Sequence, residues 1–294
     1  MSNLPNEFVL RYARPPSDSI VAQAQSLHQN VRALLGDDNY ATLLQGSYKN
    51  DTSLWDMNDV DLVAVSRGLV SGTFGSVSPG GGTVSWDEIF ARIERKLQGD
   101  ARYAGKWERK DKCIQLNTGV KIDIVPAVYV TSPESDPVAI YSRREGVERR
   151  NWPRNHYDAG AEKSRRTNGA FKQTVRLFKA WRRAVTSDSK VAPSFYIECL
   201  LHAVPDGLFS NVGADAFVFV GHAIVAWNCN TNPVVRPGGG DSIFIPTERY
   251  APQFKLFQEL LRNSLAYAEE ARRAPSEQLA REAWIRAFNG QRPS

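Results

Sequence analysis

Two short acidic segments contain the residues with the clearest capacity for chemistry. Asp59 and Asp61 flank Val60, and Asp123 lies inside the apolar run at residues 120–125. Both segments have the alternation typical of strands, and residues two apart on a strand share a face, so Asp59 and Asp61 are expected to point the same way. Three crowded carboxylates repel one another, and a divalent cation reverses that cost. Magnesium suits such a site because it binds a few carboxylates together with phosphates and water.

A Gly-Ser turn, at Gly46 and Ser47, begins 13 residues before Asp59. Glycine lets the backbone approach a ligand closely, and a serine hydroxyl with neighbouring amides can hold phosphate oxygens where a helix begins. Taken alone, a Gly-Ser pair is typical of an ordinary turn, and an Asp-X-Asp of a solvated strand end. The combination predicts nucleotidyl transfer, with two magnesium ions, or manganese in their place, held by Asp59, Asp61 and Asp123.

The first half of the chain must position these residues on a sheet. Apolar residues recur at helical spacing over 17–36, after a serine or aspartate cap, which predicts one long helix. A second amphipathic helix is expected over 86–97, and residues 106–126 are expected to form a pair of strands that carries Asp123. The glycine- and serine-rich residues 71–82 predict a surface loop rather than a phosphate-binding loop.

The second half of the chain is predicted to be mainly helical. Helical periodicity predicts helices over 168–185, 194–201, 254–267 and 276–288. Within the first of these, Lys172 and Lys179 lie two turns apart and can share one face. Arg182 and Arg183 are expected on a solvated face, since a run of cations along a helix usually is solvated.

These residues together resemble a known family. The motif Gly46-Ser47-Tyr48 with Thr52, the segment Asp59-Val60-Asp61, and Asp123 look like the active site of the polymerase-beta-type nucleotidyltransferases. Within that superfamily the chain is most similar to the bacterial cGAS-like enzymes, the CD-NTases of anti-phage defence, which are relatives of oligoadenylate synthase. The resemblance implies an α+β fold with a polymerase-beta-like core sheet, a helical oligoadenylate-synthase-like C-terminal lobe and a cleft between them. The expected domains are 1–155, including the N-terminal helix, and 156–294.

The same resemblance implies a metal-dependent synthase that makes a cyclic dinucleotide or oligonucleotide messenger from ATP and other NTPs. Asp59, Asp61 and Asp123 would be catalytic, with Gly46 and Ser47 at the nucleotide. The messenger would act on a separate effector protein, because the sequence shows no effector domain. In the family, a helix at this point of the chain supplies a lysine to the triphosphate. This implies a role for Lys172 first and Lys179 second.

Base selection is expected to depend on Asn168 and Tyr196. Tyr196 is placed to stack on a base if its helix lines the cleft, and it is a core tyrosine otherwise. Asn168 stands at the head of the 168–185 helix, where asparagine is a preferred N-cap. In one CD-NTase clade an asparagine in a comparable place reads uracil, so the resemblance also implies a pyrimidine substrate such as UTP.

The composition is that of a soluble enzyme, with 294 residues, a net charge of +5 and 42% hydrophobic residues. No apolar run approaches the roughly 20 residues that span a bilayer, and the first residues lack the basic and apolar regions of a signal peptide. The three cysteines are widely separated, which argues against a disulfide framework. We therefore expect a cytoplasmic protein without a membrane partner.

Other functions stay open at this point. The same fold can transfer a nucleotidyl group to a linear oligonucleotide, a small molecule or a protein hydroxyl. A pI near 9.1 and arginine pairs at 143–144, 149–150 and 165–166 also permit a nucleic-acid-binding module without catalysis, or a nucleic-acid activator. The net charge is modest, however, and a carboxylate cage repels phosphates unless metal is bound, so nucleic acid is not favoured.

Overall fold

The computed structural model describes residues 6–72, 75–77, 82–131, 136–229, 231–238 and 251–293. The chain divides into two compact units, each described here by itself. The sheet unit comprises Pro16–Asn50 and Asp56–Tyr157, and the helical unit comprises Met1–Pro15, Asp51–Trp55 and Asp158–Ser294. The sequence analysis assigned the N-terminal segment and residues 51–55 to the first domain. Both instead cluster with the helical unit, because their side chains and carbonyl groups contact its helices.

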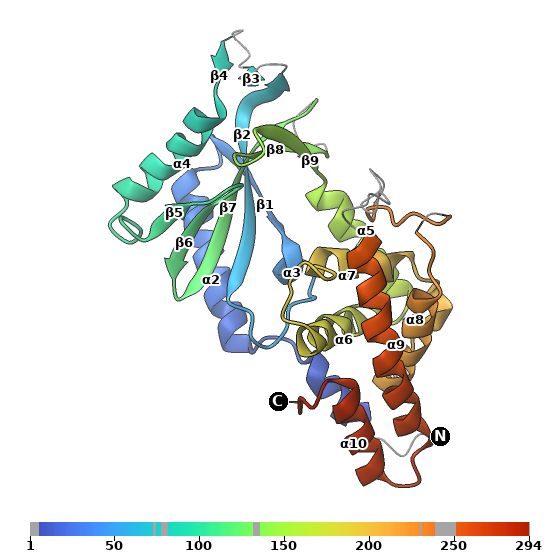
Figure 1. Ribbon diagram of the computed structural model, residues 1–294. Coiled ribbons are helices and arrows are strands. Elements are labelled where there is room, and N and C mark those ends of the chain that lie inside the picture. The colour runs from blue at the N-terminus through green and yellow to red at the C-terminus, as the bar shows by residue number, and fades with distance from the viewer. Residues whose placement is uncertain are drawn as a thin grey trace. The chain divides into compact units, whose positions relative to one another are not determined.

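One mixed sheet forms the centre of the sheet unit (Figure 1). Its strands are β1 (Tyr40–Gln45), β2 (Asp59–Gly72), β3 (Gly75–Val77), β4 (Thr83–Val84), β5 (Trp107–Arg109), β6 (Ile114–Thr118), β7 (Val120–Tyr129), β8 (Val138–Ser142) and β9 (Val147–Asn151). In the described part of the chain the order is β4-β3-β2-β7-β6-β5, with β1 also paired to β2 and the β8-β9 pair attached to β7. β2 and β7 run parallel, and all the other pairs are antiparallel.

Two long helices, α2 (Asp18–Leu35) and α4 (Trp86–Gly99), cover one face of this sheet (Figure 1). Serine caps begin both: Ser17 Oγ accepts a hydrogen bond from the Ile20 N–H at 3.4 Å, and Ser85 Oγ accepts one from the Glu88 N–H at 3.2 Å. The apolar stripes of the helices bury the alternate residues of β2 and β7 that face them. This core includes Val31, Leu35, Val60, Leu62, Ile89, Phe90, Ile93, Ile122 and Ile124.

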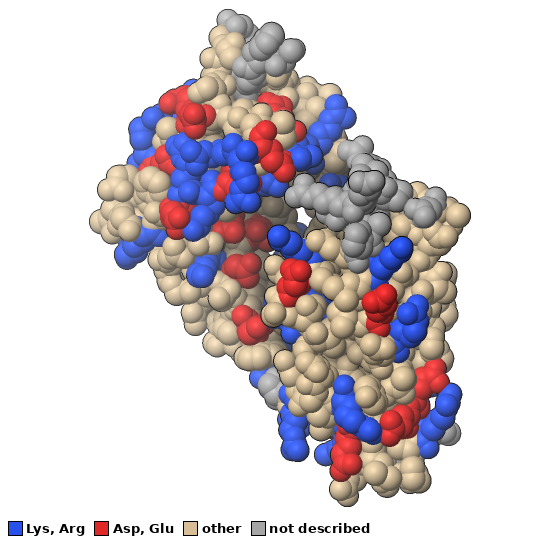
Figure 2. All heavy atoms as spheres, in the orientation of Figure 1, with Lys and Arg blue, Asp and Glu red and all other residues tan. Residues whose placement is uncertain are grey.

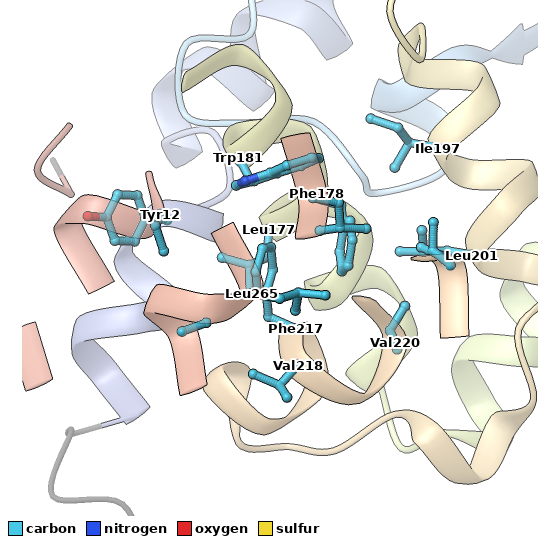
Figure 3. Packing of buried hydrophobic residues seen from close by; sticks show 14 of the residues in the cluster. Tyr12, Leu177, Phe178, Trp181, Ile197, Leu201, Phe217, Val218, Val220 and Leu265 are labelled. Carbon is cyan, nitrogen blue, oxygen red and sulfur yellow. The ribbon is translucent and has the colours of Figure 1, made fainter. Parts of the chain in front are cut away.

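The helical unit surrounds a second, larger core. Its elements are α1 (Asn6–Leu10), η1 (Arg11–Ala13), most of α5 (Pro153–Arg166), α6 (Ala170–Val185), α7 (Ser194–Ala203), η2 (Asp206–Leu208), α8 (Gly213–Val225), α9 (Ala251–Arg273) and α10 (Glu277–Ala287). Phe178 and Trp181 of α6 lie against Phe217 of α8 in Figure 3, with ring centroids of Phe178 and Phe217 4.9 Å apart. The buried Trp181 Nε1–H donates to Ser264 Oγ at 2.8 Å, which satisfies its one polar group.

Most of the predicted elements are confirmed, with two corrections. The helices predicted over 17–36 and 86–97 correspond to α2 and α4, and the four predicted for the second half correspond to α6, α7, α9 and α10. The predicted loop over 71–82 is partly wrong, because β2 continues to Gly72 and pairs with β3. The expectation that Arg182 is solvated is also wrong, since this residue is 8% exposed.

Candidate active site

The acids lie side by side on the two parallel strands at the centre of the sheet. Asp61 on β2 is the register partner of Asp123 on β7, and neighbouring strands are about 4.8 Å apart. Val60 is fully buried against the helices, whereas Asp59 is exposed and Asp61 is half-buried. The alternation of β2 therefore places both acids on the face opposite α2 and α4, as the sequence predicts.

The donor set formed by Asp59, Asp61 and Asp123 fits magnesium, because all its atoms are carboxylate oxygens and two of the residues occupy adjacent strands in register. Among the described residues, no group of three or more His, Cys, Asp or Glu side chains lies in a metal-holding arrangement. The closed cage of three carboxylates thus stays a prediction.

At Gly46 the backbone approaches the Asp61 side chain closely. A Cβ at Gly46 would lie 1.9 Å from Asp61 Oδ2, far inside van der Waals contact, and its φ of +73° favours glycine as well. The cause is the register of β1 and β2, which places Gln45 opposite Asp61 immediately before the chain turns. Gly46 and Ser47 then begin the one-turn helix α3 (Gly46–Lys49), so the predicted contiguity of the turn and the acids is confirmed.

Two side chains that were not predicted from the sequence, Gln115 and Cys113, lie beside Asp61 and Asp123. Gln115 on β6 is the register partner of Asp123, and its Nε2–H donates to Asp123 Oδ1 at 2.9 Å, which orients that carboxylate. Cys113 lies two residues earlier on the same side. Burial, together with the negative charges of Asp123 and Asp61, raises the pKa of its thiol to about 12. The signal for both was the period-two alternation of β6 combined with its pairing to β7.

Lys172 and Lys179 have different environments on α6. Lys179 is 3% exposed, and its ammonium donates to Glu198 Oε1 at 2.5 Å, Thr52 Oγ1 at 2.9 Å and the Thr52 carbonyl at 3.1 Å. Since an ammonium has three N–H donors, this geometry leaves none for a phosphate. Lys172 is half-buried and forms no hydrogen bond or ion pair within the described residues. The expected role at the triphosphate therefore rests on Lys172.

Lys179 belongs to a buried polar network that fixes residues 51–55 within the helical unit. Thr52 Oγ1 donates to Glu198 Oε1 at 2.7 Å, so three side chains share one site. Arg176, one turn before Lys179, donates through Nε to the Ala13 carbonyl at 2.9 Å and through a terminal amino group to the Asp51 carbonyl at 2.7 Å. Arg176 and Lys179 satisfy the carbonyl groups of irregular segments, which explains why α6 buries these two cations.

Asn168 does not cap α6, so the alternative role that the sequence offered for it is wrong. It is exposed, with φ of +49°, and its N–H donates to the Arg165 carbonyl at the end of α5. The N-cap of α6 is Gly169, which has no side chain to accept a hydrogen bond, and Thr167 Oγ1 accepts one from the Phe171 N–H at 3.1 Å. Asn168 instead ends α5 in the left-handed conformation that glycine and asparagine favour.

Tyr196 lies in the first turn of α7, half-buried against the helical core. This position fits the packing role that the sequence left open. Its contact with a base stays a prediction.

The sheet, with paired acids behind a Gly-Ser turn, defines a nucleotidyltransferase. A family model described as the cGAS/DncV-like nucleotidyltransferase C-terminal helical domain matches residues 158–232. The chain is 30% identical over 225 residues to a cyclic UMP-AMP synthase from Rhodothermus marinus, covering 67% of this chain and 76% of that protein. It is 26% identical over 233 residues to a cyclic dipurine nucleotide synthase from Elizabethkingia meningoseptica, covering 70% and 79% of the two chains.

A solved structure gives the same result. The Rhodothermus marinus CdnE c-UMP-AMP synthase with Apcpp and Upnpp matches with a TM-score of 0.70 and 25% identity, covering 88% of this chain and 96% of that one. This chain belongs to the CD-NTase family, and it is a nucleotidyltransferase. None of the helices in the described ranges is both long and apolar enough to cross a membrane.

Proposed function

We propose that this enzyme joins NTPs into a cyclic dinucleotide or oligonucleotide. The observation that carries the proposal is the register of Asp61 with Asp123, combined with the close approach of Gly46 to Asp61. Both features lie in the sheet unit, beside the turn that contains Ser47. Relatives whose names state cyclic nucleotide synthesis cover most of the chain, which supports this reaction class.

In this reaction a ribose hydroxyl of one nucleotide attacks the α-phosphorus of another. A P–O bond forms, the bond to the β-phosphate breaks, and pyrophosphate leaves. Asp123, oriented by Gln115, accepts or orients the hydroxyl proton. Asp59, Asp61 and Asp123 would hold two magnesium ions, which supply charge stabilisation for the attacking and leaving oxygens. Ser47 and Lys172 hold the triphosphate, and repetition of the reaction on the linear product closes the ring.

The first test replaces the two acids of β2. We expect Asp59→Asn with Asp61→Asn to reduce pyrophosphate release from NTPs by more than about 100-fold, since loss of partners even one step removed from a metal costs about 10–100-fold. Asp18→Asn, an exposed acid at the start of α2, is the control and should retain activity. Retained turnover in the double variant, with magnesium or manganese, would remove these residues from the reaction.

The product separates this proposal from its closest alternative. Incubation with NTPs singly and in pairs, followed by mass spectrometry and nuclease digestion, distinguishes a ring from a linear chain. Formation of a linear oligonucleotide, or nucleotidyl transfer only to an added small molecule or protein, would contradict the cyclic product. Either result would support a transferase of the same fold with another acceptor.

Base selection is a separate proposal, because the two relatives named above make products with different bases. We propose that Asn168 favours a pyrimidine such as UTP. Its exposed position and lack of a capping role leave its side chain available for a base edge. Asn168→Ser should lower the ratio of UTP to ATP incorporation, whereas an unchanged ratio in competition assays would contradict the assignment.

We also propose that the product acts on a separate effector protein in cytoplasmic anti-phage signalling. A nucleic-acid activator is less favoured. Two members of the arginine pairs considered for it already form ion pairs: Arg149 with Glu145 at 2.5 Å, and Arg166 with Glu162 at 2.9 Å and Asp206 at 2.6 Å. The signalling role is tested by phage challenge of cells that carry the native enzyme or the Asp59/Asp61 double variant.

A further inference from the structure

A basic pocket in the sheet unit has no part in the reaction described above. Its volume is about 530 Å³, within the usual range of small-molecule sites. It lies where β1 begins beside the middle of β2, under the second half of α4. Its lining residues are Asp38, Asn39, Tyr40, Ser66, Arg67, Arg92, Arg95 and Lys96.

The pocket is separated from the acids by both distance and sheet face. Ser66 follows Asp61 by five residues on β2, which is about 16 Å at 3.3 Å per residue. The alternation of β2 places Ser66 on the same face as Val60 and Leu62, whereas Asp59 and Asp61 face the other side. A ligand in this pocket therefore does not occupy the candidate active site.

Cations dominate the walls of the pocket. Arg92, Arg95 and Lys96 are spaced i, i+3 and i+4 on α4, so their side chains emerge from one face of the helix. Arg67 joins them from β2. Asp38 is the one carboxylate among the lining residues, all of which are described, and Glu88 just outside it pairs with Arg92 at 3.2 Å and Arg95 at 2.7 Å. Positive charge remains in excess after both acids are counted.

Several donors of these side chains are not used by the fold. Arg67 and Arg92 each bond through Nε, to the Asp37 carbonyl at 2.6 Å and to Glu88, and neither forms a hydrogen bond through its terminal amino groups within the described residues. The buried Ser66 hydroxyl interacts with the hydroxyl of Tyr40, which also lines the pocket, but forms no hydrogen bond of normal geometry in the described part of the chain. Polar atoms in this position favour a ligand that accepts hydrogen bonds.

We propose that this pocket binds a small ligand that carries phosphate groups. The planar guanidinium groups of Arg67 and Arg92 match phosphate oxygens, and Arg95 and Lys96 add positive charge. The ligand is expected to be small because eight residues line a pocket of only about 530 Å³. On the face drawn in Figure 2, lysine and arginine side chains of the sheet unit are interspersed with acidic ones, a pattern that does not suit an extended nucleic acid.

The test measures binding of inorganic tripolyphosphate by calorimetry in EDTA, where turnover does not occur. Arg67→Gln with Arg92→Gln should weaken binding at least about tenfold, because two charge-assisted hydrogen bonds are lost. The control is Arg102→Gln, an exposed arginine of the same unit that pairs with Asp100 outside the pocket. It removes charge without removing a lining residue, so its affinity should match that of the native protein.

Four outcomes would overturn the proposal. Three of them are absence of binding to the native protein, equal losses in the double variant and in Arg102→Gln, and a loss confined to Lys172→Gln, which would place the anion on α6. A fourth is tight binding of a short DNA duplex where tripolyphosphate does not bind, which would assign the pocket to nucleic acid. The assay requires neither metal nor NTP turnover, so its result does not depend on the proposed reaction.

Discussion

Gly46 is the residue whose backbone conformation and position both exclude a side chain. Gly46→Ala would place a methyl group on the Asp61 carboxylate, so Asp61 or the turn has to move. We expect a loss of pyrophosphate release of at least about 100-fold, because a shift of about 1 Å at reacting groups costs that much. The measurement is initial rate at saturating NTP and magnesium, alongside the thermal midpoint of unfolding.

Gly105 provides a matched control for this prediction. Its φ is also +73°, but a Cβ there meets no atom within 4 Å. Gly105→Ala should cost about 1 kcal/mol in the free energy of unfolding through backbone strain and leave turnover unchanged. Equal activity losses in both variants would show that strain, and not contact with Asp61, explains Gly46.

Substitutions of Lys179 and Lys172, both on α6, are expected to have opposite effects: the first on stability and the second on nucleotide binding. Lys179→Met removes the partner of the buried Glu198 and should lower the free energy of unfolding by about 3–5 kcal/mol. Lys172→Met should change stability by less than about 0.5 kcal/mol, because Lys172 forms no hydrogen bond or ion pair within the described residues, yet raise the KM for NTP. Denaturant titration and steady-state kinetics on both variants test the pair.

The double variant Lys179→Met with Glu198→Met checks the reason for the first effect. It removes both charges, so it should recover part of the stability lost in Lys179→Met. The cause proposed for the effect of Lys179→Met is the buried carboxylate of Glu198 left without a partner. A loss of unfolding free energy in the double variant that exceeds the sum of the losses in the two single variants would contradict this cause.

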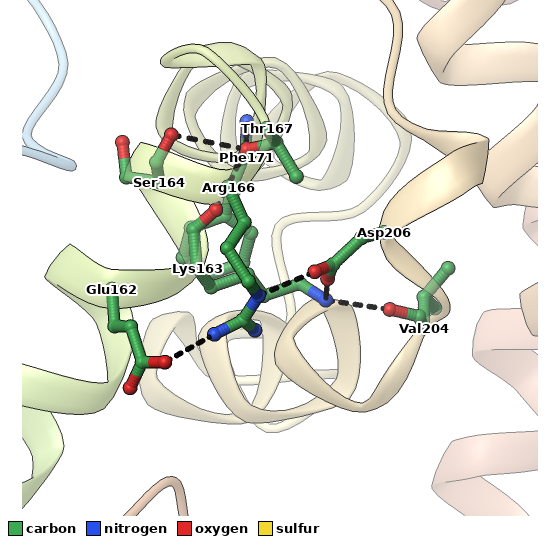
Figure 4. Close-up of polar contacts among 8 residues, drawn as sticks. All are labelled: Glu162, Lys163, Ser164, Arg166, Thr167, Phe171, Val204 and Asp206. Atoms are coloured by element: carbon green, nitrogen blue, oxygen red, sulfur yellow. Dashed lines mark hydrogen bonds and ion pairs between the residues drawn. The ribbon is translucent and has the colours of Figure 1, made fainter.

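At the scale of elements, ion pairs join the end of α5 to η2 in the helical unit. Figure 4 shows Asp206 accepting from Arg166 Nε at 2.6 Å and from Lys163 Nζ at 2.6 Å, while Lys163 also donates to the Val204 carbonyl at 2.6 Å. Hydrogen bonds from Arg166 and Lys163 lower the pKa of Asp206 from 3.8 to about 2. The folded state therefore favours the ionised carboxylate.

The pH dependence follows from that direction. The stabilisation by Asp206 is fully present above its ordinary pKa of 3.8 and is lost as pH falls towards about 2, where the folded state also becomes protonated. The difference in unfolding free energy between the native protein and Asp206→Asn should therefore shrink as pH falls from 5 to 2. A difference that is constant over this range in denaturant titrations would contradict the assignment.

At the junction of α5 and α6, the sequence pattern does not determine which residue ends one helix and which begins the next. Both Thr167 and Asn168 are capable caps, and periodicity does not choose between them. The outcome follows from α5, which the sequence analysis did not predict. Because α5 runs to Arg166, Asn168 has to end that helix, and neither residue is the N-cap of α6, which is Gly169.

At the scale of the whole molecule, the chain has two cores that differ in kind. The core of the sheet unit combines two amphipathic helices with alternate strand residues. The helical unit instead packs large aromatic rings, such as those of Trp181, Phe217 and Trp284, into one cluster. Separate cores explain why the chain divides into two compact units.

The sequence alone determined the reaction class and the face on which Asp59 and Asp61 lie. Short-range periodicity decides such features, since strand alternation and helical spacing are local properties. It also placed Gly46 close to Asp61 and identified the family that the comparisons show.

Tertiary structure alone decided which neighbours each side chain has. Gln115 reaches Asp123 through strand pairing, and Lys179 forms an ion pair with Glu198 and a hydrogen bond to Thr52, which is 127 residues away in the chain. The pocket lined by Arg67 and Arg92 likewise combines a strand and a helix distant in sequence. Burial and long-range pairing depend on packing between elements, which no local pattern of residues specifies.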